Sequence, residues 1–99
     1  MIYIILIKNI QMNYVIIYYE KFKYVKYLNA KCNEKITDDG IKHFDLQALN
    51  IYRNCKITDN GIKHMNLKVL DASMSNITNN GIKLMYLYTL KAILNPYIT

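Results

Sequence analysis

Two phrases of hydrophobic and polar residues alternate along the chain, and each returns at a nearly constant spacing. The first phrase, Ile-Thr-Asp/Asn-Asp/Asn-Gly-Ile-Lys, begins at Ile36, Ile57 and Ile77, and a fourth copy begins at Ile98. Its glycines stand at positions 40, 61 and 81, so the period is 21 and then 20 residues. Similarity at a fixed period of this length predicts a repeat architecture in which stacked units share one core.

The second phrase has the pattern L-x-x-L-x-L-x-x-N, and its copies start at Val25, Leu46, Leu67 and Leu87. Alternating apolar positions within it predict a short strand with one buried face. The residues expected to point inward are Leu28, Leu49, Leu70 and Leu90, followed by Ala30, Ile51, Ala72 and Ala92.

An asparagine stands where the chain must turn out of three of these strands: Asn33, Asn54 and Asn95. A buried asparagine there can bond backbone N–H and C=O groups of neighbouring units that would otherwise lack partners. The third copy has Ser75-Asn76 and is one residue shorter. Either residue could take the asparagine position, so we expect a local distortion.

The Ile-Thr phrase predicts a short helix on the opposite side from the strands. Thr37, Thr58 and Thr78 precede acidic or amide residues, so a hydroxyl can cap each helix while acids lie near its N-terminus. The glycine in the first turn predicts either close packing or an unusual backbone angle. Apolar pairs at spacing i, i+3 are expected to face the core: Ile41 and Phe44, Ile62 and Met65, Ile82 and Met85.

The strand phrase is the pattern of leucine-rich repeats, and I-T-D-x-G-I-K-H closely resembles the cysteine-containing class of these repeats, found in F-box proteins. The resemblance covers residues 25–99. It implies an α/β solenoid of about 3.5 coils, with parallel strands on the concave side and short helices on the convex side. We expect coils at 25–45, 46–66, 67–86 and 87–99, the last one truncated, after a degenerate N-terminal coil or cap at 1–24.

F-box proteins are substrate-recognition subunits of ubiquitin ligases, so the resemblance implies protein recognition along the concave face. This chain departs from the family, because asparagine stands where the family's strands end in cysteine, and its coils are shorter. Residues 1–24 are too few for an F-box; they read as strands over 2–7 and 14–19, or as a cap. The expectation is a substrate-recognition repeat segment without an F-box.

Outward-facing strand residues mix aromatic, polar and apolar groups, as protein-binding surfaces do. Tyr27 and Tyr52 are the expected anchors, although ordinary solvated strand residues would give the same pattern. The candidate partner-binding residues are Tyr27, Asn29, Lys31, Asn50, Tyr52, Asp71, Ser73 and Lys91.

The net charge of +6 suggests a second interpretation, a basic surface that binds polyanions. Lysines recur in two columns of the repeat, 42, 63, 83 and 35, 56. However, the chain is rich in Ile, Asn, Lys and Tyr, residues with A/T-rich codons, so an A/T-rich genome explains the excess of lysine. The tyrosines share no repeat column, which disfavours nucleic acid.

No arrangement of residues predicts catalysis, a cofactor or a metal site. His43 and His64 occupy the same place in adjacent repeats, but zinc needs three or four ligands and the third repeat has Leu84. Cys32 and Cys55 stand at different repeat positions, so we expect small buried thiols rather than a disulfide. The absence of a secretory signal and of apolar runs near ~20 residues favours an intracellular, cytoplasmic protein.

The last predicted strand, Leu90–Ala92, should expose an edge and an apolar flank. Three explanations remain open. The chain could be a truncated repeat fragment without independent function, it could self-associate end to end through this open coil, or Asn95-Pro96-Tyr97 could fold over as a cap.

Overall fold

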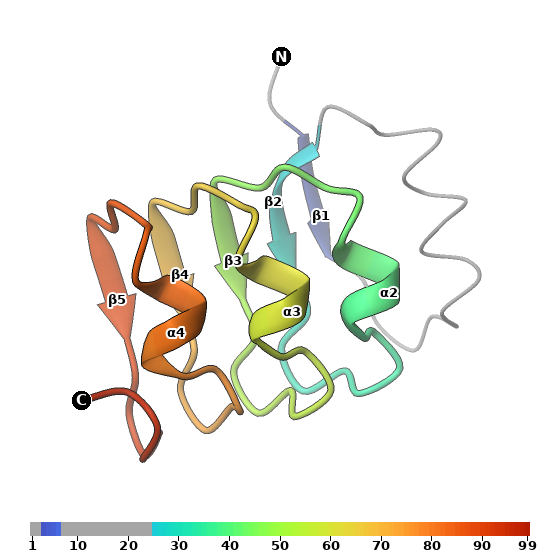
Figure 1. Ribbon diagram of the computed structural model, residues 1–99. Coiled ribbons are helices and arrows are strands. Elements are labelled where there is room, and N and C mark those ends of the chain that lie inside the picture. The colour runs from blue at the N-terminus through green and yellow to red at the C-terminus, as the bar shows by residue number, and fades with distance from the viewer. Residues whose placement is uncertain (1–2, 7–24) are drawn as a thin grey trace.

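A computed structural model of the protein describes residues 3–6 and 25–99. It confirms an α/β fold in which a parallel sheet alternates with short helices (Figure 1). The strands follow one another across the sheet in chain order. They are β1 (Tyr3–Leu6), β2 (Val25–Asn29), β3 (Ala48–Asn50), β4 (Val69–Asp71) and β5 (Thr89–Lys91). The helices are α2 (Asp38–Ile41), α3 (Asp59–Ile62) and α4 (Asn79–Ile82), which lie side by side over one face of the sheet (Figure 1).

The N-terminal strand adds to the sheet beyond the four repeat copies. β1 lies within the strand expected over residues 2–7 and pairs in parallel with β2. The second expected strand, over residues 14–19, lies outside the described residues.

Equivalent repeat positions lie directly opposite one another in the sheet. Leu28 opposes Leu49, which opposes Leu70, which opposes Leu90. We call each strand, with the turn and helix that follow it, one coil. Because neighbouring strands are about 4.8 Å apart, each repeat position becomes a row of side chains across the coils.

The core fills the space between the sheet and the helices, as the alternating pattern predicted. The inward leucines of β2, β3 and β4 are buried. The apolar pair at the end of α2 and just after it is also buried, and so is the equivalent pair of α3. The corresponding pair in the next coil, Ile82 and Met85, is half-buried. Buried core residues include Leu28, Leu49, Leu70, Ile41, Phe44, Ile62 and Met65.

A ladder of buried amides joins successive coils, which confirms the role expected for the asparagines. Asn54 is fully buried, and its Oδ1 accepts hydrogen bonds from the N–H groups of Lys56 and Ile57. Asn95 makes the same kinds of bonds, within its own turn and to the coil before it. The Asn54 amide donates to the carbonyls of Ala30 (3.3 Å), Asn33 (2.9 Å) and Ile36 (3.3 Å), and that of Asn95 to Ala72 (2.9 Å) and Ile77 (3.1 Å).

In the shorter third turn, two residues make the bonds that a single asparagine makes in the second coil. Ser75 takes the buried position, and its hydroxyl donates to the carbonyl of Ala72 within the same coil. Asn76 is exposed and reaches the preceding coil through the Cys55 carbonyl, at 3.1 Å. The expected distortion is therefore a separation of the intra-coil and inter-coil bonds.

One residue in each turn adopts the left-handed backbone conformation, immediately before the buried asparagine or serine. None of the four is glycine, although an L-residue pays about 1–2 kcal/mol for this conformation. The residues are Cys32 (φ 58°), Arg53 (φ 56°), Met74 (φ 51°) and Leu94 (φ 54°).

The first residue of each described helix bonds to the threonine of the next Ile-Thr phrase along the chain. Two of the bonds join a carboxylate to both the backbone N–H and the hydroxyl of that threonine, and the third joins an asparagine side chain to threonine. Asp38 bonds Thr58 (2.7 and 2.5 Å), Asp59 bonds Thr78 (2.9 and 2.5 Å), and Asn79 bonds Thr99 (2.9 and 3.1 Å).

The threonine capping prediction holds for two helices of three. Thr58 and Thr78 accept hydrogen bonds from the N–H groups of Asn60 and Asn80, at 3.3 and 3.2 Å. Thr37 makes no such capping bond. Asp38 and Asp59 also bond the hydroxyls of the two capping threonines, which holds them in place.

The helix glycine is required for close packing, because no glycine in the described chain has positive φ. A Cβ on Gly61 would lie 2.9 Å from Cγ of Asp38, and one on Gly81 would lie 2.7 Å from Cγ of Asp59. These are the carboxylates that bond the next threonine, so they cannot move away without losing those bonds.

Each of the described helices has only four residues. None of them is therefore long and apolar enough to cross a membrane, which takes about 20 residues.

Candidate functional site

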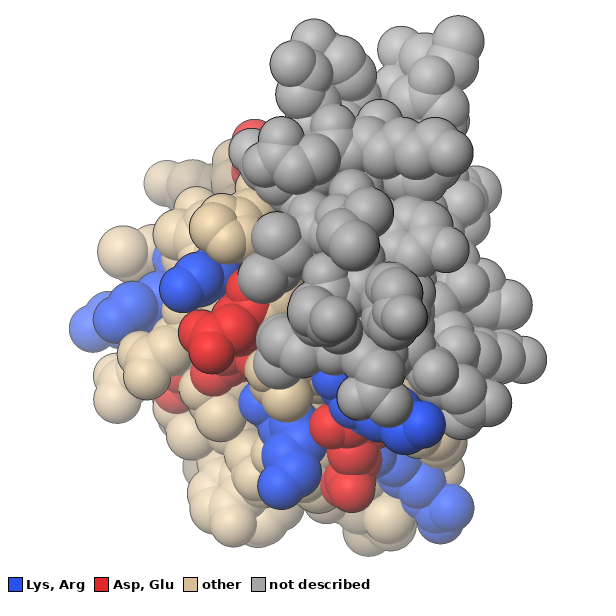
Figure 2. Space-filling view, turned by 90° about the vertical axis from the view of Figure 1, so that its right-hand side faces the viewer, with Lys and Arg blue, Asp and Glu red and all other residues tan. Residues whose placement is uncertain are grey.

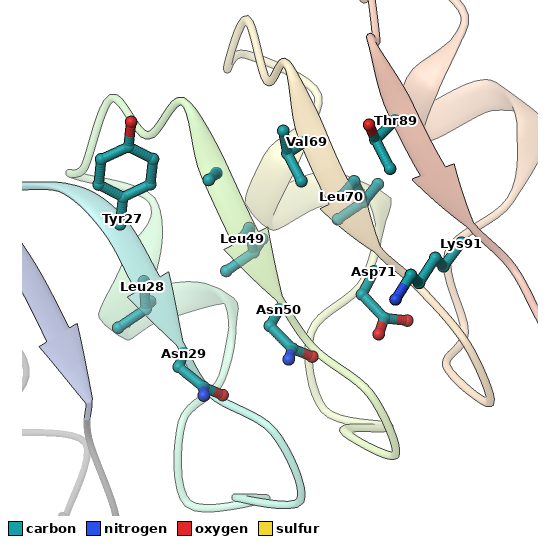
Figure 3. A pocket seen from close by; sticks show the side chains of 11 residues that line it. Tyr27, Leu28, Asn29, Leu49, Asn50, Val69, Leu70, Asp71, Thr89 and Lys91 are labelled. Atoms are coloured by element: carbon teal, nitrogen blue, oxygen red, sulfur yellow. The ribbon is translucent and has the colours of Figure 1, made fainter.

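A groove of about 280 Å³ crosses four strands of the sheet, from β2 to β5 (Figure 3). It lies on the face where the outward strand residues stand, opposite the helices. The inward leucines of β2, β3 and β4 also contribute to its floor. Its remaining lining residues are Tyr27, Asn29, Ala48, Asn50, Val69, Asp71, Thr89 and Lys91.

Two rows of side chains with different chemistry border the groove. The upper row is mostly apolar, and strand register places its members opposite one another: Tyr27, Ala48, Val69 and Thr89. The lower row is polar and stands one pleat further along the strands: Asn29, Asn50, Asp71 and Lys91 (Figure 3).

The polar row also shapes the turns that follow the strands. The Oδ1 atoms of Asn29, Asn50 and Asp71 each accept a hydrogen bond, at 3.0 Å, from the backbone N–H two residues later. Short side chains that bond their own backbone in this way favour a turn. These residues therefore have a structural role in the turns, in addition to any role in binding. The strand pattern did not predict this structural role. The signal was present, because Asn or Asp ends three successive strands.

The structure brings five of the eight candidate binding residues into the groove. Lys31 and Tyr52 lie beyond its polar end, where the Lys31 Nζ is 5.2 Å from the centre of the Tyr52 ring. The expectation that Ser73 is exposed was wrong, because its side chain is 1% exposed and its Oγ accepts a hydrogen bond from the N–H of Ile93. The five groove residues are Tyr27, Asn29, Asn50, Asp71 and Lys91.

The last coil presents a second surface, which is apolar. Among the described strands, β5 is the edge of the sheet, and no strand pairs with its outer side. The Asn95-Pro96-Tyr97 segment does not cover this side, since Tyr97 is itself exposed and Leu94 is 75% exposed. Large exposed apolar residues are frequent from the end of α4 onward: Leu84, Tyr86, Tyr88, Ile93, Leu94 and Tyr97.

Titratable side chains form no metal-ligand group of three or more among the described residues. His64 Nε2 lies 3.3 Å from the carbonyl oxygen of Phe44, a backbone partner from the preceding coil. The expectation of buried thiols was wrong, since Cys32 and Cys55 are both free and exposed. The reason is local: Cys32 occupies the left-handed turn position, Cys55 follows the buried asparagine, and that asparagine takes the interior place.

The groove and the apolar surface of the last coil are therefore candidate binding surfaces. Comparison with protein-family models, with curated proteins and with solved structures finds no match to this chain.

Proposed function

We propose that this chain is a leucine-rich-repeat solenoid that binds another protein in the strand-lined groove. The repeat phrases, their register in the sheet and the buried asparagine ladder support the assignment of the fold. A substrate-recognition role of the kind found in F-box proteins would use the same groove.

The observation that carries the proposal is the combination of an apolar row and a polar row along one groove. Protein-binding surfaces combine an apolar centre with polar groups at the rim. Val69 lies at the middle of the apolar row and is 41% exposed, and Tyr27 stands at its end as an aromatic anchor. A partner segment lying across the strands could cover the apolar row and form hydrogen bonds with the polar row.

Site-specific photo-crosslinking in cells tests this proposal. A photoreactive amino acid is placed at Val69 in the groove and, in a control protein, at Lys63 on the helix side. We expect one defined protein to be crosslinked from position 69 and not from position 63. Tyr27→Ala should reduce that crosslink strongly while leaving the thermal unfolding midpoint within a few degrees, because Tyr27 is only half-buried.

Equal crosslinking from both positions would contradict the proposal, since it would show that the groove has no preference. A crosslink from position 69 that survives Tyr27→Ala unchanged would also contradict it. Lys63→Ala serves as the matched surface substitution and should have no effect.

Self-association is a second candidate function, which the apolar terminal coil favours. Exposed apolar patches and open strand edges promote association. Sedimentation velocity over a range of concentrations should then show dimers or larger species that Tyr88→Lys with Leu94→Lys returns to monomer. A wild-type chain that stays monomeric at high concentration excludes this candidate and leaves the groove proposal untouched.

A further inference from the structure

A second hollow lies on the edge of the sheet where the strands end, between the turns that follow β2 and β3. Its volume is about 650 Å³, and it lies outside the groove. Figure 2, which views the molecule from the β1 side, shows basic side chains gathered along this lower edge with acidic ones between them. The lining residues are Cys32, Asn33, Glu34, Lys35, Arg53 and Lys56.

Arg53, the single arginine of the chain, is held in place at this hollow. Its backbone adopts the left-handed conformation and its N–H donates to the Ser73 carbonyl, at 3.2 Å. Its guanidinium lies 5.5 Å from the centre of the Tyr52 ring, and its Nε is 3.5 Å from the Met74 sulfur. These contacts restrain the guanidinium group and use only one of its five N–H donors in a hydrogen bond.

Positive charge outweighs negative charge in the hollow. Lys35, Arg53 and Lys56 line it beside one acid, Glu34, and Lys31 approaches the same Tyr52 ring as Arg53. Among the described residues, the ion pairs join Lys26 to Asp45 and Lys42 to Asp39, so these lining cations have no carboxylate partner there. Like charges that converge without a counter-charge create a local potential that attracts anions.

The basic hollow is a property of the first two turns and not of the repeat. The equivalent turn of the third coil reads Met74-Ser75-Asn76, and that of the fourth reads Leu94-Asn95-Pro96, with no charged residue in either. In contrast, the lysine that ends each helix recurs in all three coils, at Lys42, Lys63 and Lys83. Charged residues thus occur only in the first two turns, whereas the lysine after the helix is the same in every coil that has one.

We propose that this hollow binds a phosphate group. A restrained guanidinium presents paired N–H donors that match the oxygens of a phosphate, and two lysines add charge around it. Arg53 would supply the directional contacts, with Lys35 and Lys56 as the neutralising charges. The site is separate from the groove, so it does not depend on the proposed binding of a protein there.

Titration of the ¹⁵N-labelled full chain with inorganic phosphate, followed by NMR at constant ionic strength with chloride as the balancing ion, tests the site. Backbone amides of residues 32–35 and 53–56 should shift together and saturate. Arg53→Gln should weaken the fitted Kd roughly tenfold, as expected for one charge-assisted hydrogen bond. Lys56→Gln should weaken it in the same direction but by less. Lys63→Gln removes the same charge from the helix side and is the matched control, with an expected change below about twofold.

Shifts that do not saturate, or equal weakening by Arg53→Gln and Lys63→Gln, would overturn the proposal in favour of general charge attraction. A short phosphoserine peptide, with its unphosphorylated form beside it, distinguishes the source of the phosphate. Tighter binding of the phosphopeptide than of inorganic phosphate at the same amides identifies a phosphorylated protein. Binding of inorganic phosphate that is as tight or tighter identifies the free anion. Unchanged spectra with both probes would also overturn the proposal.

Discussion

Leu70 and Leu90 occupy the same repeat position, in neighbouring strands that pair with each other, yet their environments differ. Leu70 is 0% exposed, whereas Leu90 is 38% exposed. The helix residues follow the same trend, since Ile41 and Ile62 are buried and Ile82 is half-buried. The phrases are nearly identical, so the difference comes from the presence or absence of a neighbouring coil.

The core between two coils is therefore formed by apolar side chains from both of them. An apolar residue in such a fold gains its full burial only when coils stand on both sides. Among the described residues, the buried hydrophobic core accordingly runs from Leu28 to Ile77. Paired substitutions in the two regions test this difference.

Leu70→Ala should lower the free energy of unfolding by about 3–4 kcal/mol, because it leaves a cavity in a fully packed site. Leu90→Ala should lower it by only about 1 kcal/mol, since much of that side chain remains in water. Chemical denaturation of both variants measures the two values. Equal losses would show that the two coils are packed alike.

Asn54→Ala should destabilise the protein by about 2–3 kcal/mol, because it leaves buried carbonyls of the preceding coil without a donor. Asn95→Ala should cost about 1–2 kcal/mol, since its amide donates to two carbonyls rather than to three. Hydrogen exchange should show lost protection in the substituted coil, where N–H groups lose the asparagine Oδ1 as acceptor, and also in the coil before it. Loss confined to the substituted coil would contradict the ladder between coils.

Gly61→Ala should destabilise by about 1–2 kcal/mol through crowding against Asp38, in spite of alanine's better helix propensity. In an Asp38→Ala background the same substitution should cost much less, because the crowded carboxylate is absent. Unfolding of the four proteins in this double-mutant cycle measures the coupling. Additive effects would show that glycine is needed for another reason.

Leu94→Gly should stabilise the protein by about 0.5–1 kcal/mol, because glycine adopts the left-handed conformation without a steric penalty. Leu84→Gly is the matched control, since Leu84 is similarly exposed but has no positive φ. That substitution should be neutral or destabilising. Thermal unfolding compares the pair, and a stabilising effect of both would point to the loss of exposed apolar surface instead.

The sequence predicted most of the fold because period and polarity constrain it from several sides. Leucine at one position and asparagine five residues later required a strand that ends in a buried turn, and the structure has both. The Asp38–Thr58 bond was missed, because the acid and the threonine were each assigned to the N-terminus of their own helix. Only the stacking of coils shows that residues 20 positions apart are partners.

The candidate site was less predictable, because the alternation of exposed and buried residues along a strand does not continue into the turn that follows it. Tyr27, Asn50 and Asp71 line the groove as expected. Ser73 failed because the chain has left the strand there, and its hydroxyl is drawn inward by the N–H of Ile93. The hollow at Arg53 needed the structure, since only the packing of the turns after β2 and β3 places Arg53 beside Lys35 and Lys56.

The left-handed turn residue has a consequence for how this protein can change over generations. Cysteine, arginine, methionine and leucine all occupy this position, so the surrounding coils fix the backbone and place little demand on the side chain. A position whose geometry is fixed by its surroundings can be mutated freely and still hold its side chain in the same place. Each added coil supplies one more such position, about 4.8 Å from the last. The fold therefore provides a regularly spaced row of sites where new chemistry can arise without loss of the core.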